Sequence, residues 1–424
     1  MKNRFILASL LALGIGSAAF AQEASKPQLK LYGFIRNYFA YDTRESVAGT
    51  EDFFYWVPKD ESIQNGMDVN AVHSFRFAAL TSRVGLDVTG YQVQGWNLGA
   101  KIEADFYAGV SGVTGTATLR LRQAYLTMAK NAVSLKIGQA WHPMAADMPD
   151  VFSLNTGAPF GPFSRTPLVS ADFKLSNDFS LTAAAIWQMQ YTSAGPNGAK
   201  ADYIKYGRTP EIYLGLNYKS ADGLIARIGV DLLSIKPRVY NTNNGTSAGA
   251  TKKVSDRITT FSPFAYLQYS KGLFSVKAKT VFAQSGEHVG LNGGYGVKAE
   301  GFDINGDWNY SPSRNSSSWV SLAYGSKVKG ILFGGYVKNF GTKEEVLMDR
   351  YYFSKNSFAN LNSMWRLTPT VLYNLGKFQL GLEYELTSVQ YGSIDLTKPY
   401  FGLATKDLHW VTNHRVQMMV KYTF

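Results

Sequence analysis

Hydrophobic and polar residues alternate with a period of two along most of the chain. In one clear segment, Leu98, Ile102 and Phe106 are interleaved with Lys101 and Glu103. The C-terminal residues keep this alternation up to the last position. The period predicts β-strands with one apolar and one polar face, and helical periodicity is nearly absent. A soluble β-sandwich shows the same alternation, so the connections between strands have to distinguish the two classes of protein.

The predicted connections alternate between short and long. Clusters of Gly, Asn, Asp, Lys and Ser predict seven short turns, at residues 90–95, 130–132, 176–178, 219–223, 271–272, 326–330 and 374–377. Between them lie eight longer connections, at residues 43–72, 108–118, 140–166, 193–209, 237–256, 285–315, 341–362 and 390–406. Short periplasmic turns and long extracellular loops are typical of outer-membrane barrels.

Fifteen connections join sixteen strands. The strands are expected at residues 29–42, 74–89, 96–107, 119–129, 133–140, 167–175, 179–192, 210–218, 224–236, 257–270, 273–284, 316–325, 331–340, 363–373, 378–390 and 408–424. Lipid cannot satisfy the edge amides of an open sheet, so the sheet has to close on itself. The sequence therefore predicts an all-β fold, a sixteen-stranded antiparallel transmembrane β-barrel.

The N-terminal 21 residues have the three parts of a secretory signal peptide. Lys2 and Arg4 precede an apolar run, and small residues end the segment at Ala19 and Ala21. The chain is thus expected to consist of a signal peptide, residues 1–21, and one barrel domain, residues 22–424, in the outer membrane of a Gram-negative bacterium. No later segment approaches the roughly 20 consecutive apolar residues of a membrane helix.

Composition narrows the possible functions. The chain has no cysteine, which removes disulfides, thiol catalysis and thiolate metal sites. Its formal net charge is +12. An exported protein meets no nucleic acid, so the positive charge is better explained by attraction of small anions than by nucleic-acid binding. Outer-membrane lipid is the expected surrounding of the barrel wall.

Several motifs resemble the sixteen-stranded trimeric porins of Gram-negative bacteria. They lie at residues 31–36 (LYGFIR), 82–85 (SRVG), 119–126 (LRLRQAYL) and 137–141 (IGQAW). The order Arg-x-Arg-x-Ala-Tyr followed by Gly-Gln-x-Trp is most similar to the DcaP-like porins and their Bacteroidetes relatives. The resemblance implies a passive diffusion channel, a homotrimer, and a third extracellular loop folded into the lumen.

The C-terminal strand carries a further resemblance. Tyr422 and the final Phe424 alternate with polar residues. They resemble the signal that the barrel assembly machinery of the outer membrane reads, so this machinery is an expected partner.

Charged residues of the polar faces are candidates for the pore lining. A cation on the lipid face at mid-depth would cost about 2–4 kcal/mol, so basic residues of the strands are expected in the lumen. The wall candidates are Arg36, Arg83, Lys101, Arg120, Arg122 and Lys136. The third long loop adds Asp147, Asp150 and Arg165.

Two positions conflict with strict alternation. Arg76 and Arg83 are seven residues apart, which puts them on opposite faces unless a bulge between Ala78 and Ser82 resets the phase. Gln123 falls on the nominal lipid face, which indicates either packing against a neighbouring subunit or an error of phase.

The mechanism expected from these residues is field-guided diffusion. Guanidinium groups on one wall and carboxylates on the loop would create a transverse field that orients polar solutes. Arginine also binds carboxylates bidentately. The expected solutes are small and hydrophilic, with a preference for anions and, as the family resemblance suggests, for dicarboxylates.

Two other classes of protein stay open. One is a barrel hydrolase with a Ser-His pair, and the other is an adhesin or structural barrel with a plugged lumen. Residues 245–249 match a nucleophile-elbow pattern, but in a Gly/Ser/Thr-rich loop without strand-turn-helix context. Asp303, Asn305 and Asp307 hint at a calcium loop, yet Trp308 occupies the position of the required glycine.

The histidines give no further motif. Their positions show no metal-ligand spacing: His73, His142, His288, His409 and His414. We therefore expect no catalytic residue, no metal site and no cofactor.

Overall fold

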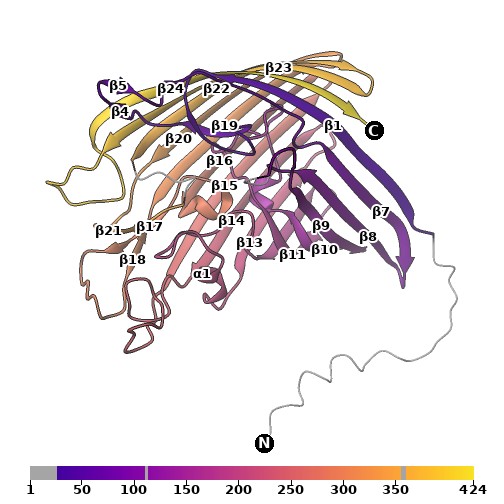
Figure 1. The fold of residues 1–424 in the computed structure, drawn as a ribbon. Helices are drawn as coiled ribbons and strands as arrows, with labels where there is room; N and C mark the ends of the chain where they lie inside the picture. The colour runs from indigo at the N-terminus through magenta and orange to yellow at the C-terminus, as the bar shows by residue number, and fades with distance from the viewer. Residues whose placement is uncertain (1–25, 110–112, 355–359) are drawn as a thin grey trace, which may run out of the picture.

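Sixteen antiparallel strands form the barrel (Figure 1). The computed structural model describes residues 26–109, 113–354 and 360–424. The signal peptide predicted at residues 1–21 lies outside the described residues. The barrel strands are β1 (Gln28–Asp42), β6 (Ser74–Ala78) with β7 (Arg83–Val93), β8 (Trp96–Phe106), β9 (Leu119–Lys130), β10 (Val133–Trp141), β11 (Arg165–Lys174), β12 (Phe179–Ile186), β13 (Glu211–Lys219), β14 (Leu224–Ile235), β15 (Ile258–Lys271), β16 (Phe274–Gln284), β19 (Arg314–Gly325), β20 (Val328–Asn339), β22 (Leu361–Leu375), β23 (Phe378–Ser393) and β24 (Lys406–Thr423).

The first and last strands close the sheet. Strand β1 pairs with β24 from Phe34 to Asp42 on one side and with β6 and β7 on the other. At the seam the Phe424 amide donates to the Gly33 carbonyl over 3.1 Å. A Cβ atom at Gly33 would lie 2.3 Å from the Arg83 carbonyl oxygen and 2.6 Å from the Phe424 ring. Only glycine therefore fits this crossing without a backbone shift.

The predicted barrel is confirmed, and the second strand is interrupted where a bulge was expected. Strands β6 and β7 together form this strand, and Thr81 between them has a positive φ of 72°. Arg76 lies opposite Ala40, and Arg83 lies opposite Phe34. Because Ala40 and Phe34 share one face of β1, the interruption returns both arginines to the lumen side.

Polarity is inverted relative to a soluble protein. On β23 and β24, Leu382 and Met418 are each 53% exposed, whereas Glu383 and Arg415 are fully buried. On these strands apolar side chains cover the outer face and polar side chains line the inner face, as in transmembrane barrels. No helix among the described residues has the length and apolarity to cross a bilayer.

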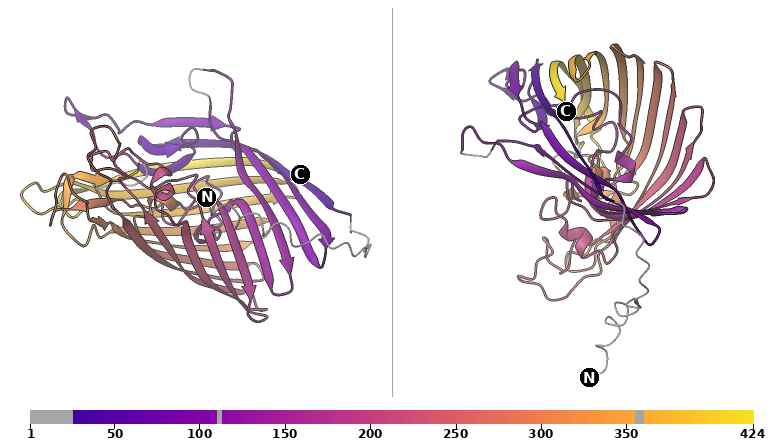
Figure 2. Two further views of the ribbon diagram at one scale, coloured as in Figure 1. Left: turned by 90° about the horizontal axis from the view of Figure 1, so that it is seen from below. Right: turned by 90° about the vertical axis from the view of Figure 1, so that its right-hand side faces the viewer.

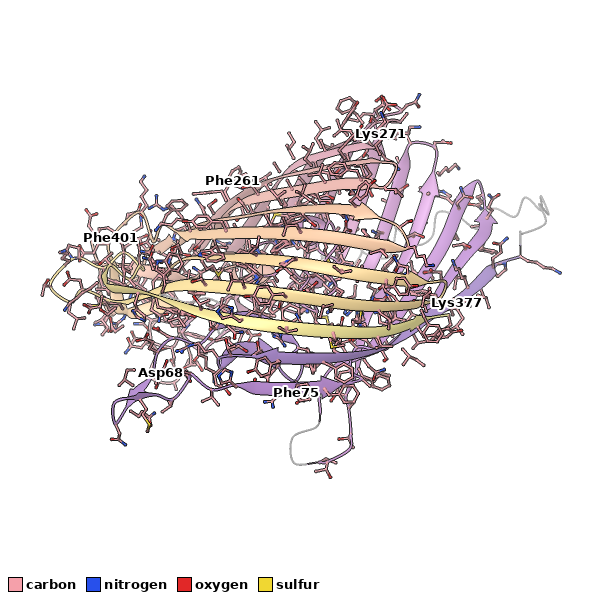
Figure 3. All side chains as sticks on the ribbon, turned by 90° about the horizontal axis from the view of Figure 1, so that it is seen from above. Asp68, Phe75, Phe261, Lys271, Lys377 and Phe401 are labelled. Carbon is pink, nitrogen blue, oxygen red and sulfur yellow. The ribbon has the colours of Figure 1, made fainter. Side chains whose placement is uncertain are left out.

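The long connections gather at one end of the barrel and the short turns at the other (Figure 2). In Figure 3, Asp68 and Phe401 mark the long-loop end, and Lys271 and Lys377 mark the short-turn end. The predicted seventh strand is shorter than expected, because β12 ends at Ile186 rather than at residue 192. The long connections contain short elements of their own: β2 (Ser46–Gly49), β3 (Phe54–Pro58), β4 (Ile63–Gln64), β5 (Met67–Asp68), the 3₁₀ turns η1 (Pro143–Ala145) and η2 (Gly286–Val289), α1 (Asp202–Lys205), β17 (Tyr295–Lys298), β18 (Tyr310–Pro312) and β21 (Val346–Tyr352).

Candidate pore constriction

The third long connection, residues 142–164 and called loop 3 below, lies inside the barrel. The Tyr38 hydroxyl of β1 donates to the Phe152 carbonyl over 2.9 Å. The Glu383 carboxylate of β23 accepts from the Phe152 and Ser153 amides over 3.0 and 3.2 Å. Since Tyr38 and Glu383 are buried on the inner face, these bonds hold the middle of loop 3 against that part of the barrel wall.

A second set of bonds holds the first half of loop 3 against the β14–β16 part of the barrel wall. The Lys279 ammonium donates to the Met144 and Asp147 carbonyls over 2.8 and 2.6 Å. The Asp147 carboxylate lies 3.2 Å from Arg227 of β14, and Asp150 lies 2.6 Å from Lys277 of β16. Loop 3 is therefore bonded on two sides of the lumen, which places it across the interior.

The first long connection, residues 43–73 and called loop 1 below, also enters the barrel, which the alternation of polar and apolar residues did not predict. Tyr55 and Val57 of β3 are fully buried. The Tyr55 ring lies between the guanidinium groups of Arg366 and Arg415, at 4.8 and 5.1 Å from its centroid. Burial raises the pKa of the Tyr55 hydroxyl to about 12, so the ring stays neutral. The aromatic run FFYW at residues 53–56 was the signal for this inward segment.

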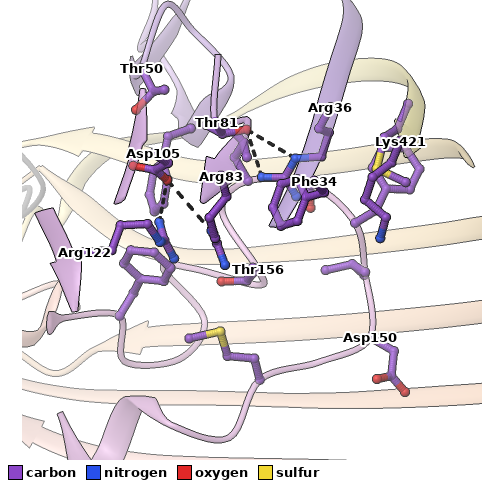
Figure 4. Close-up of a pocket in the computed structure, with 18 of the residues that line it drawn as sticks. Phe34, Arg36, Thr50, Thr81, Arg83, Asp105, Arg122, Asp150, Thr156 and Lys421 are labelled. Carbon is purple, nitrogen blue, oxygen red and sulfur yellow. Dashed lines mark hydrogen bonds and ion pairs between the residues drawn. The ribbon is translucent and has the colours of Figure 1, made fainter. Parts of the chain in front are cut away.

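Between loop 3 and the wall of β1 and β7–β9 lies a cavity of about 460 Å³, called the constriction cavity below. Six of the nine residues predicted to form the constriction line it: Arg36, Arg83, Arg120, Arg122, Asp150 and Arg165. Figure 4 shows Arg83 extending from the wall toward Thr156 of loop 3, with Arg36 directed at Thr81 and Arg122 at Asp105. Lys421 of β24 completes the cationic lining.

Part of this positive charge is neutralised by two wall carboxylates of β8. Asp105 accepts two bonds from Arg120, at 2.9 and 3.0 Å, and one from Arg122 at 2.7 Å. Glu103 accepts from Arg122 at 2.7 Å and lies 3.6 Å from Arg83. These side chains form one network that fixes the orientation of three guanidinium groups.

Three other cations of the constriction cavity have no acidic partner. Arg36 bonds the Thr81 hydroxyl at 2.8 and 3.2 Å, and the Arg165 guanidinium stacks over Trp141 at 4.7 Å. Within the described part of the chain, no carboxylate forms an ion pair with Arg36, Arg165 or Lys421. Buried Arg165 also has one nitrogen, Nη1, without a hydrogen-bond partner. The cavity therefore presents an excess of positive charge.

The expected opposition of wall cations and loop carboxylates is not what the structure shows. Asp150 lines the constriction cavity, but Lys277 and Lys329 lie 2.6 and 3.6 Å from its oxygens. Asp147 does not line it and instead pairs with Arg227. Both carboxylates are already paired with lysine or arginine, because strands β14, β16 and β20 also carry cations on their inner faces. The loop carboxylates therefore do not stand as free negative charges opposite the wall arginines.

Two predicted wall residues lie elsewhere. Lys101 pairs with Asp87 at 2.7 Å and covers the Tyr32 ring at 4.4 Å, outside the constriction cavity. Lys136 lines a separate cavity of about 290 Å³ together with Asp172 and Arg227.

Gln123 faces the lumen, which corrects its assignment to the lipid face. The register between β8 and β9 shifts, so Glu103 lies opposite Gln123 and the next residue, Ala104, lies opposite Leu121. Arg122 is the extra residue of this bulge. The Gln123 amide donates to Glu103 over 3.3 Å inside the barrel. No neighbouring subunit is needed to explain its polarity, because the bulge reset the phase of the strand.

The other motifs stay in loops. Residues 245–249 lie in an irregular connection between β14 and β15. Asp303 accepts from the Asn305 amide over 2.9 Å, and Asp307 accepts from the Ser255 hydroxyl. These bonds explain the two carboxylates as local loop contacts.

Comparisons with known proteins agree with this geometry. A family described as "DcaP outer membrane protein" matches residues 17–158. The structure of the outer membrane channel DcaP of Acinetobacter baumannii superposes with a TM-score of 0.67 at 19% identity, covering 94% of this chain and 97% of that one. The chain has the porin fold. The expected resemblance to DcaP-like porins is confirmed, and the outer membrane is the location that the family description gives.

Two further porin-fold structures show the same architecture. The anion-selective porin from Comamonas acidovorans has a TM-score of 0.54 at 13% identity and is covered in full, with 94% of this chain aligned. The trimer form of OmpT, an outer membrane protein of Vibrio cholerae, has a TM-score of 0.52 at 14% identity, with 94% and 99% coverage. No curated protein matches the chain. At these identities the structures establish the fold of the porin barrel and no finer property.

Proposed function

We propose that this porin-fold barrel is a passive outer-membrane channel that favours small hydrophilic anions. The observation that carries the proposal is the set of three cations, Arg36, Arg165 and Lys421, that face the constriction cavity without acidic partners. A fixed positive charge in a narrow aqueous passage raises the local concentration of anions and lowers that of cations.

The preference would extend to dicarboxylates. Two carboxylates of one solute can contact two guanidinium groups at once, and each Arg–carboxylate contact is charge-assisted. A similar channel from Acinetobacter and a similar anion-selective porin support this class of function, and the trimer form of Vibrio OmpT supports a homotrimer. The same proposal includes a cleaved signal peptide and one barrel domain. It also includes recognition of Tyr422 and Phe424 by the barrel assembly machinery.

The reversal potential under a salt gradient tests the proposal. The informative variant is Arg36→Gln with Lys421→Gln, because neither substitution leaves a carboxylate without its partner. Replacing Arg120 and Arg122 would instead leave Asp105 and Glu103 with fewer partners. The loss of positive charge could then not be separated from the effect of the freed carboxylates. The matched control is Lys271→Gln with Lys377→Gln, which removes two charges at the short turns (Figure 3).

The expected size follows from Coulomb's law. A unit charge about 4 Å from an ion contributes about 1 kcal/mol in a water-like dielectric. Each removed charge acts on anions and cations in opposite directions, so we expect the anion-to-cation permeability ratio to fall by at least about tenfold in the variant at about 0.1 M salt. The fall should be much smaller at about 1 M, where screening acts over about 3 Å. The control should keep the wild-type ratio. Cation selectivity in the wild type, or equal ratios in all three proteins, would contradict the proposal.

One observation favours a second candidate, the plugged barrel, because loops 1 and 3 both occupy the lumen. A folded barrel that carries no current in planar bilayers would support that candidate over the channel. Ester turnover by such a silent barrel would instead favour the hydrolase alternative.

A further inference from the structure

Four titratable side chains meet at the long-loop end of the barrel, outside the constriction cavity. They come from four segments: His142 at the start of loop 3, Glu211 at the first position of β13, Asp231 on β14, and His288 on the turn η2. Their side chains are at most 1% exposed. We call this set the His-Glu-Asp cluster.

The ligand-capable atoms of the cluster face one another. His288 Nε2 lies 3.2 Å from Asp231 Oδ2 and 3.7 Å from Glu211 Oε1. His142, Glu211 and Asp231 each offer an atom within 4.8 Å of the other two. Atoms bound at about 2.0–2.1 Å to one tetrahedral ion lie about 3.3–3.4 Å apart. The separations around His288 are thus close to those of ligands of a single ion.

The hydrogen bonds of the two imidazole rings indicate which nitrogen of each ring is free to face the carboxylates. His288 Nδ1 lies 3.0 Å from the Ser285 carbonyl, to which it donates, and Nε2 is directed at the two carboxylates. Metal-ligating histidines commonly have this arrangement. His142 Nδ1 instead accepts from the Met144 amide at 3.2 Å, so its Nε2 carries the proton and donates to Glu211 over 2.6 Å. His142 therefore supports Glu211 through this hydrogen bond.

Glu211 and Asp231 are two buried carboxylates that lie close together. In addition, buried Glu211 Oε2 and Asp231 Oδ1 have no hydrogen-bond partner. Unsatisfied buried oxygens are costly, and a bound cation would satisfy both of them.

We propose that Glu211, Asp231 and His288 bind a divalent transition-metal ion, with Zn²⁺ as the reference ion. Neutral His288, two carboxylates and a divalent ion sum to zero charge. The two unpartnered carboxylate oxygens complete the coordination by bidentate binding, and His142 holds Glu211 in place through its hydrogen bond. This set of one imidazole and two carboxylates fits Zn²⁺ better than Mg²⁺, which prefers oxygen ligands in octahedral geometry.

The ion would join β13, β14 and the turn η2 directly, and the root of loop 3 through His142. Sequence spacing could not reveal this site, because its residues lie far apart along the chain. The expectation that no metal site exists rested on spacing alone. The proposal does not depend on the proposed channel activity.

Metal content of the folded full-length barrel tests the proposal. The protein is equilibrated with Zn²⁺, dialysed against metal-free buffer and analysed by mass spectrometry for bound metal. We expect one Zn²⁺ per chain in the wild type and none in Asp231→Asn with His288→Gln. The matched control is His409→Gln, which removes a histidine that contacts Asp60 over 2.7 Å at a partly exposed site, and it should keep its Zn²⁺. Mg²⁺ alone should not be retained.

A second readout covers the case in which the double variant fails to fold. Zn²⁺ should raise the unfolding temperature of the wild-type barrel, and a chelator should reverse the increase. A wild-type barrel that retains no Zn²⁺ and keeps the same unfolding temperature with and without it would overturn the proposal. Equal Zn²⁺ content in the wild type and in a folded double variant would also overturn it.

Discussion

Glu383→Gln should release the middle of loop 3 without opening the barrel. The Glu383 carboxylate accepts three hydrogen bonds: from the Phe152 amide at 3.0 Å, the Ser153 amide at 3.2 Å and the Thr370 hydroxyl at 2.7 Å. All three partners donate. Glutamine has one oxygen and one NH₂ group, so at least one donor of loop 3 or Thr370 would face another donor.

The size of the effect follows from these bonds. A hydrogen bond to a charged group contributes about 1.5–3 kcal/mol, and a neutral amide oxygen keeps part of that. We therefore expect the displaced state of loop 3 to become more favourable by about 1.5–3 kcal/mol. This corresponds to a roughly 10- to 100-fold larger population. The barrel itself should stay closed, because the ladder between β23 and β24 is untouched.

Hydrogen exchange of the Phe152 and Ser153 amides measures this population directly. Exchange should accelerate by the same factor in Glu383→Gln, while amides of β24 keep their rates. Glu45→Gln is the control, because the Glu45 carboxylate pairs with Lys59 at an exposed site. Unchanged exchange at both loop amides in a folded Glu383→Gln barrel would refute the idea that this carboxylate holds the loop.

Two further substitutions test the seam of the barrel and the link between its inner loops. Gly33→Ala should destabilise the barrel by about 1–3 kcal/mol, because the new Cβ meets the Arg83 carbonyl at 2.3 Å. The control Gly334→Ala has free space around the new Cβ and should leave the stability in urea unfolding unchanged. Equal urea midpoints for the two variants would exclude a steric role for Gly33. Arg366→Lys should increase hydrogen exchange in loops 1 and 3 together. Arg366 donates to the carbonyls of Trp56 at 2.7 Å and Ala158 at 3.0 Å, and the single ammonium group of a lysine cannot reproduce this planar two-pronged geometry. Faster exchange in only one of the two loops would contradict the shared contact.

The sequence alone determined the barrel, its strand number and its inverted polarity. Alternation is a local property of each strand, and a membrane forces the sheet to close, so the count of short and long connections was enough. The interruption near Thr81 was also predictable, because two arginines seven residues apart had to share the lumen. Four cavity arginines followed from the same alternation, and Asp150 and Arg165 followed from the third long connection. Lys421 could have been added, since it stands in the polar register of β24.

Only the tertiary structure decided which charges remain free and what fills the lumen. The pairing of Asp150 with Lys277, the lumen position of Gln123 and the inward course of loop 1 depend on register shifts and on contacts between distant segments. The same holds for His142 and His288, which share the carboxylates of Glu211 and Asp231. A period of two tells which face a side chain is on, but which partner it meets depends on how the closed sheet and its loops bring distant residues together.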